Sequence, residues 1–251
     1  MAIRGLRDKS ARHTERKFVV EGHKCVVEAL QSGWMIHGLY VSSQSDCPEE
    51  WNAEPVSSKE MERMSAFKSP PGVLAVVGIP EVESLSAELW AAQPEEPFGM
   101  AIDGLSDPGN LGTLLRTADW FGLSGIWATS GVVDPFNPKV VQASMGAVFR
   151  VQVRVVDLPE LLHEMEACNV RTLGMSMAGE DVWAMPGRPG EEGKWLAVLG
   201  SESHGLSETV SQACSGHVHI PGGGGSESLN ATMAAGMVLS EWYARGRRSV
   251  H

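Results

Sequence analysis

The sequence predicts an α/β protein in which helices cover both faces of a parallel sheet, with a smaller α/β unit ahead of it. Short apolar stretches alternate with segments of helical periodicity from residue 98 onward, which is the pattern of parallel-sheet proteins. The chain of 251 residues has room for one or two domains. Its composition, 43 % hydrophobic and 20 % charged, is that of a globular protein with a buried core.

Alternating strand and helix signals define the smaller unit, which we expect at residues 1–80. Val19 and Val20 predict a short strand, and apolar residues at helical spacing predict a helix after it: Cys25, Val26, Ala29 and Leu30. Residues 36–42, IHGLYVS, predict a second strand. Ser57, followed three residues later by Glu60, has the spacing of a capping box and predicts a helix start. The stretch SPPGVLAVVGI predicts a turn and a further strand.

Acidic residues bounded by prolines predict a linker at residues 81–97, and the parallel-sheet domain is then expected at 98–251. Its strands are expected at FGMAIDGL, GIWATS, FRVQVRVV, RTLGMSM, WLAVLGS and GHVHIP. Its helices are expected at LGTLLRTADWFG, LPELLHEMEAC, LSETVSQAC and residues 228–243. Asn110 is suited to cap the first of these helices, and Gly122 to close it.

Polar, glycine-rich segments follow three of the expected strands, at residues 103–110, 200–205 and 221–228. Ligands of parallel sheets bind beyond the carboxyl ends of the strands. We therefore expect the three segments to meet in one site.

Several classes of protein are excluded by composition. No window of about 18 apolar residues is free of charge, so no membrane span is expected. The opening stretch MAIRGLRDKSARHTERKF has no apolar run of the signal-peptide type. The four cysteines are scattered without a CxxC pair, which argues against a zinc site and a disulfide framework. We expect a cytoplasmic protein with reduced thiols and no metal.

Charge is distributed unevenly along the chain. The net charge of −11 argues against a polyanion partner, because neutralising phosphates requires lysine and arginine. Basic residues nevertheless crowd both ends: Arg4, Arg7, Lys9, Arg12, Arg16, Lys17 and Lys24, then Arg245, Arg247 and Arg248. Charge alone leaves two interpretations open, a polyanion-binding arm and a solvated helix face.

The stretch IPGGGGSESLNATMAAGMVL, residues 220–239, does not fit the common glycine-rich motifs. No lysine follows the glycines, which excludes a P-loop, and the GxGxxG spacing of a dinucleotide fold is absent. The nearest approach to a serine hydrolase motif is SESHG around Ser203, where Ser201 stands in place of glycine. His204 adjoins Ser203, but sequence neighbours are an unusual nucleophile–base pair. The glycines permit positive φ and close approach of the backbone to a ligand.

Two charged residues stand out, and the residues alone leave their roles open. Arg116 lies in the apolar helix LLRTA, either as a half-buried side chain reaching solvent or as a functional group. Glu202 directly follows a buried strand, where it either favours the dipole of the next helix or belongs to a site.

Three motifs in register resemble the SpoU (TrmH-like) family of RNA ribose 2′-O-methyltransferases in the SPOUT superfamily. The first comprises Asn110, Gly112, Arg116, Thr117 and Ala118, and is followed by the similar stretch DPFNPKVVQASMGAVFRVQV. The second comprises Gly200, Glu202 and Gly205. The third comprises Ile220, Pro221, Gly224, Gly225, Glu227, Ser228, Leu229 and Asn230. RKFVVEGHKCVVEAL and SPPGVLAVV resemble the family's small substrate-binding domain, which is related to an RNA-binding ribosomal-protein fold.

The resemblance implies a C-terminal trefoil knot, a homodimer with the site at the subunit interface, and S-adenosylmethionine as methyl donor. It implies a structured rRNA or tRNA substrate, with Arg116 at the 2′-hydroxyl and four residues orienting it: Asn110, Glu202, Ser228 and Asn230. Cofactor contacts are implied at Leu199, Gly200, Gly205, Ile220, Gly225, Ser228 and Leu229. RNA contacts are expected at Arg4, Arg7, Lys9, Arg12, Arg16 and Lys17.

Departures from the family pattern concern the adenine pocket, where Gly222 replaces a frequent Met and Ser226 a frequent Val. The alternative function is a catalytically inactive RNA-binding or ribosome-assembly protein on the same fold. Retention of the catalytic set argues against that alternative.

Overall fold

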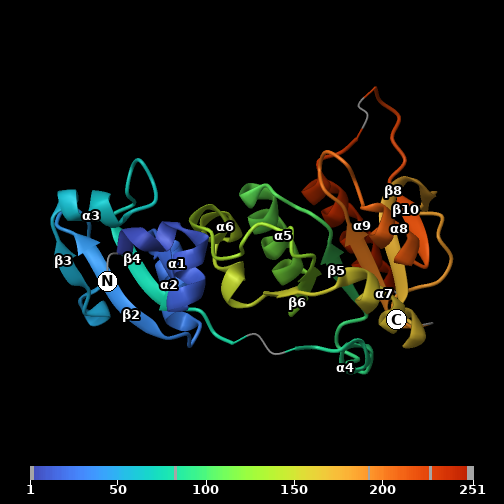
Figure 1. Ribbon diagram of the computed structural model, residues 1–251, viewed down its shortest axis with the longest axis horizontal. Coiled ribbons are helices and arrows are strands. Elements are labelled where there is room, and N and C mark those ends of the chain that lie inside the picture. The colour runs from blue at the N-terminus through green and yellow to red at the C-terminus, as the bar shows by residue number, and fades with distance from the viewer. Residues whose placement is uncertain (1–2, 82–83, 192, 226–227, 248–251) are drawn as a thin grey trace.

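The computed structural model describes residues 3–81, 84–191, 193–225 and 228–247, and within them the chain forms two β-sheets (Figure 1). The first sheet has the order β1-β4-β2-β3. Its strands are β1 (Lys17–Glu21), β2 (Ile36–Ser42), β3 (Glu54–Val56) and β4 (Val73–Gly78). Strand β4 runs antiparallel to β1 and β2, and β3 runs parallel to β2.

Short helices accompany this first sheet. They are η1 (Ile3–Arg7), α1 (Lys9–Glu15), α2 (His23–Gln31), η2 (Glu49–Trp51) and α3 (Ser58–Met64). The capping box at the start of α3 is confirmed, because the Ser57 side chain accepts from the Glu60 N–H and the Glu60 carboxylate accepts from the Ser57 N–H. Helix α1 was not predicted, because its only buried residue is Arg12 and it has no apolar stripe.

The second sheet is parallel throughout, which confirms the predicted parallel α/β sheet. Its order is β10-β8-β9-β5-β6-β7, and every neighbouring pair runs parallel. Its strands are β5 (Phe98–Ile102), β6 (Gly125–Ala128), β7 (Gln152–Val155), β8 (Arg171–Asp181), β9 (Trp195–Leu199) and β10 (Gly216–His219). The central strands β5 and β9 are fully buried, as expected for a sheet covered on both faces.

Helices cover both faces of this sheet, and alternation along β5 separates the two layers. Met100 and Ile102 pack with α5 (Pro108–Trp120), α6 (Pro138–Ser144) and α9 (Ala231–Arg247). Ala101, which points to the opposite face, packs with α4 (Ala87–Ala91), α7 (Leu158–Ala167) and α8 (Glu208–Ala213). A short helix, η3 (Ala147–Phe149), follows α6. Among the described residues, no helix is long and apolar enough to cross a bilayer.

The start of α5 differs from the prediction. Asp107, not Asn110, is the N-cap, and its carboxylate accepts from the Asn110 backbone N–H at 2.8 Å. Pro108 takes the first helical position, where its missing N–H costs no hydrogen bond. Asn110 therefore lies within the first turn, and its side chain is free for other contacts. The predicted closure at Gly122 is confirmed, since this residue has a φ of 78° directly after the last turn.

The segment expected to be a linker carries structure of its own. Helix α4 buries Trp90 completely against α7 and the second sheet, and the Trp90 indole donates to Glu96 at 3.0 Å. Burial of this tryptophan fixes α4 to the second sheet.

Candidate functional site

The three sequence motifs meet beyond the carboxyl ends of β5 and β9. Asn110 at the start of α5 donates from Nδ2 to Glu202 Oε1 at 2.6 Å. Asn230, at the start of α9, donates from Nδ2 to Asn110 Oδ1 at 3.3 Å. These contacts join residues 92 and 120 positions apart in the chain. The edge of the sheet thus gathers the motifs as the parallel topology predicts.

The turn that presents Glu202 depends on two glycines. Ser201 and Gly205 exchange backbone hydrogen bonds at 2.9 and 3.0 Å, which closes a tight turn with Glu202 within it. A Cβ atom on Gly200 would lie 2.1 Å from the carbonyl carbon of Gly205, so no larger residue fits there. Gly205 has a φ of 68°, a conformation that glycine adopts without strain. The spacing of glycines around Glu202 is therefore a geometric requirement of this turn.

The Asn230 amide is oriented by its second role at the start of α9. Its Oδ1 atom accepts from the Thr232 N–H at 2.9 Å and from the Thr232 hydroxyl at 2.6 Å. This leaves Nδ2 to donate to Asn110, which in turn donates to the Glu202 carboxylate. The result is a directional relay of hydrogen bonds that ends on a negative charge, the strongest type of acceptor. Helix capping on α9 thereby fixes the orientation of the Asn110 side chain on α5.

Arg116 lies on α5 outside this relay. Its side chain is exposed, and within the described residues the guanidinium makes no hydrogen bond or ion pair. The half-buried alternative considered from the sequence is therefore wrong. An exposed guanidinium has five donors to offer an external anion.

The predicted cofactor contacts divide into packed and open residues. Leu199 and Gly200 are buried at the end of β9, and Ile220 is half-buried against the core. Gly225, Ser228 and Leu229 are exposed. Ser226 and Glu227 lie outside the described residues.

The glycines at 222–225 have open space where a side chain would project. A Cβ atom on any of them would meet nothing within 4 Å, and Figure 1 shows this part of the chain extending away from the body above β10. Within the described residues, their backbone N–H groups make no hydrogen bond to another backbone group. This segment can therefore offer backbone donors and acceptors to a ligand.

The basic residues near the N-terminus do not form a single class. Arg4, Arg7, Lys9 and Arg16 are exposed, and Lys17 is half-buried. Arg12 is only 2 % exposed and binds Asp134, so the expectation that it contacts RNA is wrong. Four of its five N–H groups donate to Asp134 and to the Leu6 and Arg7 carbonyls, and burial keeps the guanidinium away from an external phosphate.

At the other end of the chain, the Arg245 guanidinium binds Glu241 and the backbone carbonyls of Met185, Val182 and Trp183. Arg245 therefore anchors α9 to the segment after β8 instead of extending a polyanion surface. Arg248 lies outside the described residues.

Ser203 and His204 do contact each other, with 2.7 Å between Oγ and Nδ1, although both are exposed. Within the described residues, no carboxylate binds the other ring nitrogen of His204, so the third member of a hydrolase triad is missing. No cluster of three or more metal-ligating side chains occurs in the part of the chain that the structure describes.

A groove of about 500 Å³, lined by both apolar and polar side chains, lies between α5 and α9 and was not predicted. Its lining includes Thr113, Thr117, Trp183, Met233, Gly236 and Met237. Met233 is 61 % exposed, and Trp120 on the same side of α5 is 84 % exposed. The sequence signal is the pair Met233 and Met237, which lie at helical spacing within the helix expected at residues 228–243.

Both parts of the chain match models of known protein families. The model described as the SpoU rRNA Methylase family matches residues 97–240, and the MRM3-like substrate binding domain matches residues 1–75. The Bacillus subtilis 23S rRNA (guanosine(2553)-2′-O)-methyltransferase RlmP is 26 % identical over 96 % of this chain and 93 % of its own.

Two solved structures share the fold over almost the full length. A TrmH-family structure from Porphyromonas gingivalis has 34 % identity, covers 98 % of this chain and 96 % of its own, and has a TM-score of 0.79. An AdoMet-bound rRNA methyltransferase from Sinorhizobium meliloti has 27 % identity and a TM-score of 0.82. The match covers 100 % of this chain and 94 % of that protein's chain.

Proposed function

The chain belongs to the SpoU rRNA methylase family, and we propose that it transfers a methyl group from S-adenosylmethionine to a ribose 2′-hydroxyl of structured rRNA or tRNA. The observation that carries this proposal is the meeting of Asn110, Glu202 and Asn230 at the start of the helix that presents the exposed Arg116. The 2′-hydroxyl as acceptor is supported by the name of the B. subtilis relative.

The residues present fit S-adenosylmethionine. The closed turn at Gly200 and Gly205 and the open backbone groups at 222–225 suit a nucleoside that is recognised by main-chain hydrogen bonds. The residues that would hold it are Leu199, Gly200, Gly205, Ile220, Gly225, Ser228 and Leu229. When bound, this donor supplies an electrophilic methyl group on a sulfonium centre. An AdoMet-bound structure from S. meliloti shares the fold.

Arg116 acts by charge and position. A guanidinium stays protonated at neutral pH, so it stabilises the oxyanion that develops on the ribose and holds the adjacent phosphate. The relay through Asn110 fixes Glu202 near the acceptor, where the carboxylate orients the nucleotide. Methyl transfer depends mainly on alignment of the reacting atoms, and Ser228 and Asn230 complete the set that provides it.

The first sheet supplies RNA affinity in this proposal. The exposed cations are Arg4, Arg7, Lys9 and Arg16, with the half-buried Lys17 beside them, and this region matches a substrate-binding domain. The division into units at 1–80 and 98–251 belongs to the same proposal. The target is a loop or bulge, because ribose groups there are more accessible than in a regular helix.

A second copy of this chain covers the groove between α5 and α9. Exposed apolar side chains on one face, with Trp120 and Met233 foremost, are typical of an interface. Two residues that line the groove, Thr117 and Thr232, lie one and two positions from Arg116 and Asn230 in the chain, and in this proposal a partner seated there completes the site. We also propose a trefoil knot in the C-terminal segment, supported by the placing of β9 between β8 and β5, out of chain order.

The proposal is tested by Arg116→Ala, with Arg63→Ala, which replaces another exposed arginine at a distant helix (α3), as the control. Arg116→Ala should bind S-adenosylmethionine like the wild type in calorimetry and lose at least about 100-fold in methyl transfer to RNA, as for loss of an oxyanion-stabilising donor. Wild-type turnover by Arg116→Ala would remove this residue from the mechanism. No observation favours the non-catalytic alternative, which would predict no donor binding by the wild type.

A further inference from the structure

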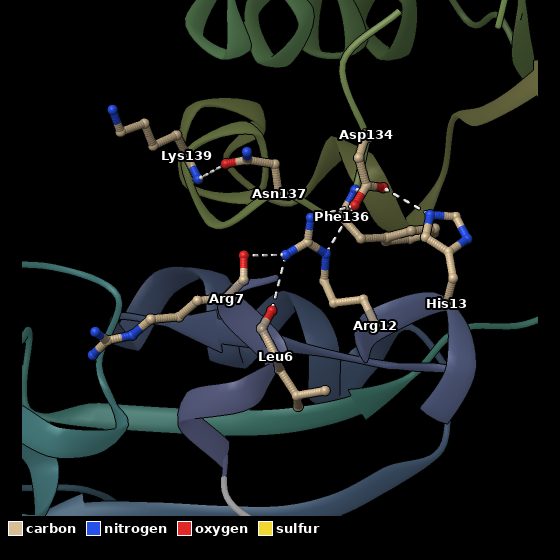
Figure 2. A network of polar contacts seen from close by, with 8 residues as sticks. All are labelled: Leu6, Arg7, Arg12, His13, Asp134, Phe136, Asn137 and Lys139. Carbon is tan, nitrogen blue, oxygen red and sulfur yellow. Dashed lines mark hydrogen bonds and ion pairs between the residues drawn. The ribbon is translucent and has the colours of Figure 1, made fainter. Parts of the chain in front are cut away.

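Arg12 lies at the junction between the two sheets, and every donor nitrogen of its guanidinium is used there. Nε and Nη2 donate to Asp134 Oδ2 at 2.8 and 2.5 Å. Nη1 donates to the backbone carbonyls of Leu6 and Arg7 at 2.9 and 2.7 Å (Figure 2). One side chain therefore joins η1, which carries the exposed Arg4 and Arg7, to a loop of the second sheet.

The loop that holds Asp134 follows β6 and contacts the start of the catalytic segment. The Val133 N–H donates to the Leu105 carbonyl at 2.9 Å. The Gly104 N–H donates to the Thr129 hydroxyl at 3.0 Å. Residues 104 and 105 lead into the Asp107 cap and the first turn of α5, which presents Asn110. An unbroken series of hydrogen-bonded segments thus runs from Arg7 to Asn110.

Aromatic packing holds the same junction closed. Phe18 of β1 lies 4.8 Å from Phe136, ring centroid to centroid, and Phe136 follows Asp134 in the loop. The Asp134 carboxylate also accepts from the Phe136 N–H at 3.0 Å, so the charged pair and the aromatic pair act on one turn. The ion pair of Arg12 and the packing of Phe136 therefore both hold this loop against the first sheet.

We propose that Arg12 is a positioning residue that fixes the RNA-binding cations of η1 at a set distance and orientation relative to the catalytic loop. The inference rests on the proposed methyl transfer. RNA held on Arg4 and Arg7 then reaches Arg116 at a fixed distance and angle. The N-terminal segment contributes orientation of the substrate in addition to affinity.

A hydrophobic pair would hold two domains together as well as a buried ion pair does, because burying charges is costly. A forked guanidinium, in contrast, specifies direction through several hydrogen bonds at once. The Arg12 site combines such a fork with burial, since Arg12 is 2 % and Asp134 5 % exposed. This geometry is better suited to fixing the orientation of the two parts of the chain than to merely holding them together.

The molecule offers a matched control. A second ion pair joins the two parts of the chain, from Arg150 Nη1 to Glu28 Oε2 at 2.5 Å. Arg150 also binds Asp119 of α5, so Glu28→Gln removes only the contact between the two parts. Neither Arg150 nor Glu28 contacts the loop at 129–137 in the described interactions.

The experiment compares Asp134→Asn with Glu28→Gln in the full-length chain. Asp134→Asn keeps the side-chain shape and an acceptor for the Phe136 N–H but removes the charge opposite Arg12. We expect single-turnover transfer at saturating RNA to fall about tenfold or more, since misplacement by about 1 Å can cost about 100-fold. Donor affinity in calorimetry should not change. Hydrogen exchange should rise at residues 103–107 and 129–137, whereas Glu28→Gln should leave both readouts as in the wild type.

Unchanged exchange at residues 103–107 in Asp134→Asn would overturn the proposal, as would an equal loss of rate in Glu28→Gln. If Asp134→Asn does not fold, Arg12→Lys keeps the charge without the fork and should raise exchange at the same residues above the wild-type level. Exchange equal to that of the wild type in Arg12→Lys would then overturn the proposal. An inactive wild type would refute the proposed function, and the exchange measurement alone would then decide the role of Arg12.

Discussion

Substitution of Gly200 by alanine tests the closed turn on which the site is built. The added Cβ would lie 2.1 Å from the Gly205 carbonyl carbon and 2.3 Å from the Leu206 nitrogen, and ordinary contact begins at 3.4 Å. The backbone must therefore shift by about 1.3 Å, the difference between 3.4 and 2.1 Å. Because both obstructing atoms are main-chain atoms, we expect the upper range for overpacking, about 3 kcal/mol of unfolding free energy.

Two measurements follow the consequence of this shift. The midpoint temperature of thermal unfolding should be lower in Gly200→Ala than in the wild type by roughly 6–12 °C, because a chain of this size loses about 2–4 °C per kcal/mol. Methyl transfer should fall about 100-fold, since Glu202 moves with the turn. Gly216→Ala is the control, because its Cβ meets Leu173 only at an ordinary 3.4 Å. A Gly200→Ala protein with the stability and rate of the wild type would refute the closed turn.

Three further predictions concern RNA affinity, pH and assembly. Replacing Arg4, Arg7 and Lys9 by glutamine should lower the slope of log affinity against log salt by about 2–3, at about 0.7–0.9 per phosphate contact, and an unchanged slope would leave these residues as solvated charges. Truncating the N-terminus is the poorer test, because it also removes Leu6 and Arg12 from buried positions. Burial raises the pKa of the Glu21 carboxyl above 4.5 in the native state. The protonated carboxyl therefore favours the native state. This contribution to the free energy of unfolding is fully present below pH 4.5 and is lost as the pH rises through the raised pKa. Glu21→Gln should therefore gain thermal stability relative to wild type between pH 4 and pH 7, and parallel curves for the two proteins would contradict this. Met233→Glu places a charge in the groove between α5 and α9. The sedimentation coefficient should fall from the value of a dimer to that of a monomer. An unchanged coefficient would place the interface elsewhere.

The parallel sheet could be predicted because its strands have strong local signals. Phe98–Ile102 and Trp195–Leu199 are unbroken apolar runs, and both are buried on their two faces. Helix α1 and strand β3 lack such signals. Helix α1 buries an arginine in place of an apolar stripe, and β3 is a three-residue edge strand that contains Pro55.

The site was predictable as a set of residues but not as a geometry. The motifs identified Asn110, Glu202 and Asn230, and the topology explained why they meet. The direction of the relay depends on Thr232 orienting the Asn230 amide, which no spacing indicates. Arg12 could not be separated from its basic neighbours, because its burial depends on Asp134, 122 residues away.

Mass spectrometry of nucleosides is the most direct test that the Asn110 relay and Arg116 form one site for ribose methylation. RNA from cells that lack the protein should be incubated with the purified chain and S-adenosylmethionine, then digested and analysed. We expect one nucleoside with the added methyl group on the ribose, absent with Arg116→Ala. A methyl group on a base, or an equal ribose product from Arg116→Ala, would contradict the central claim.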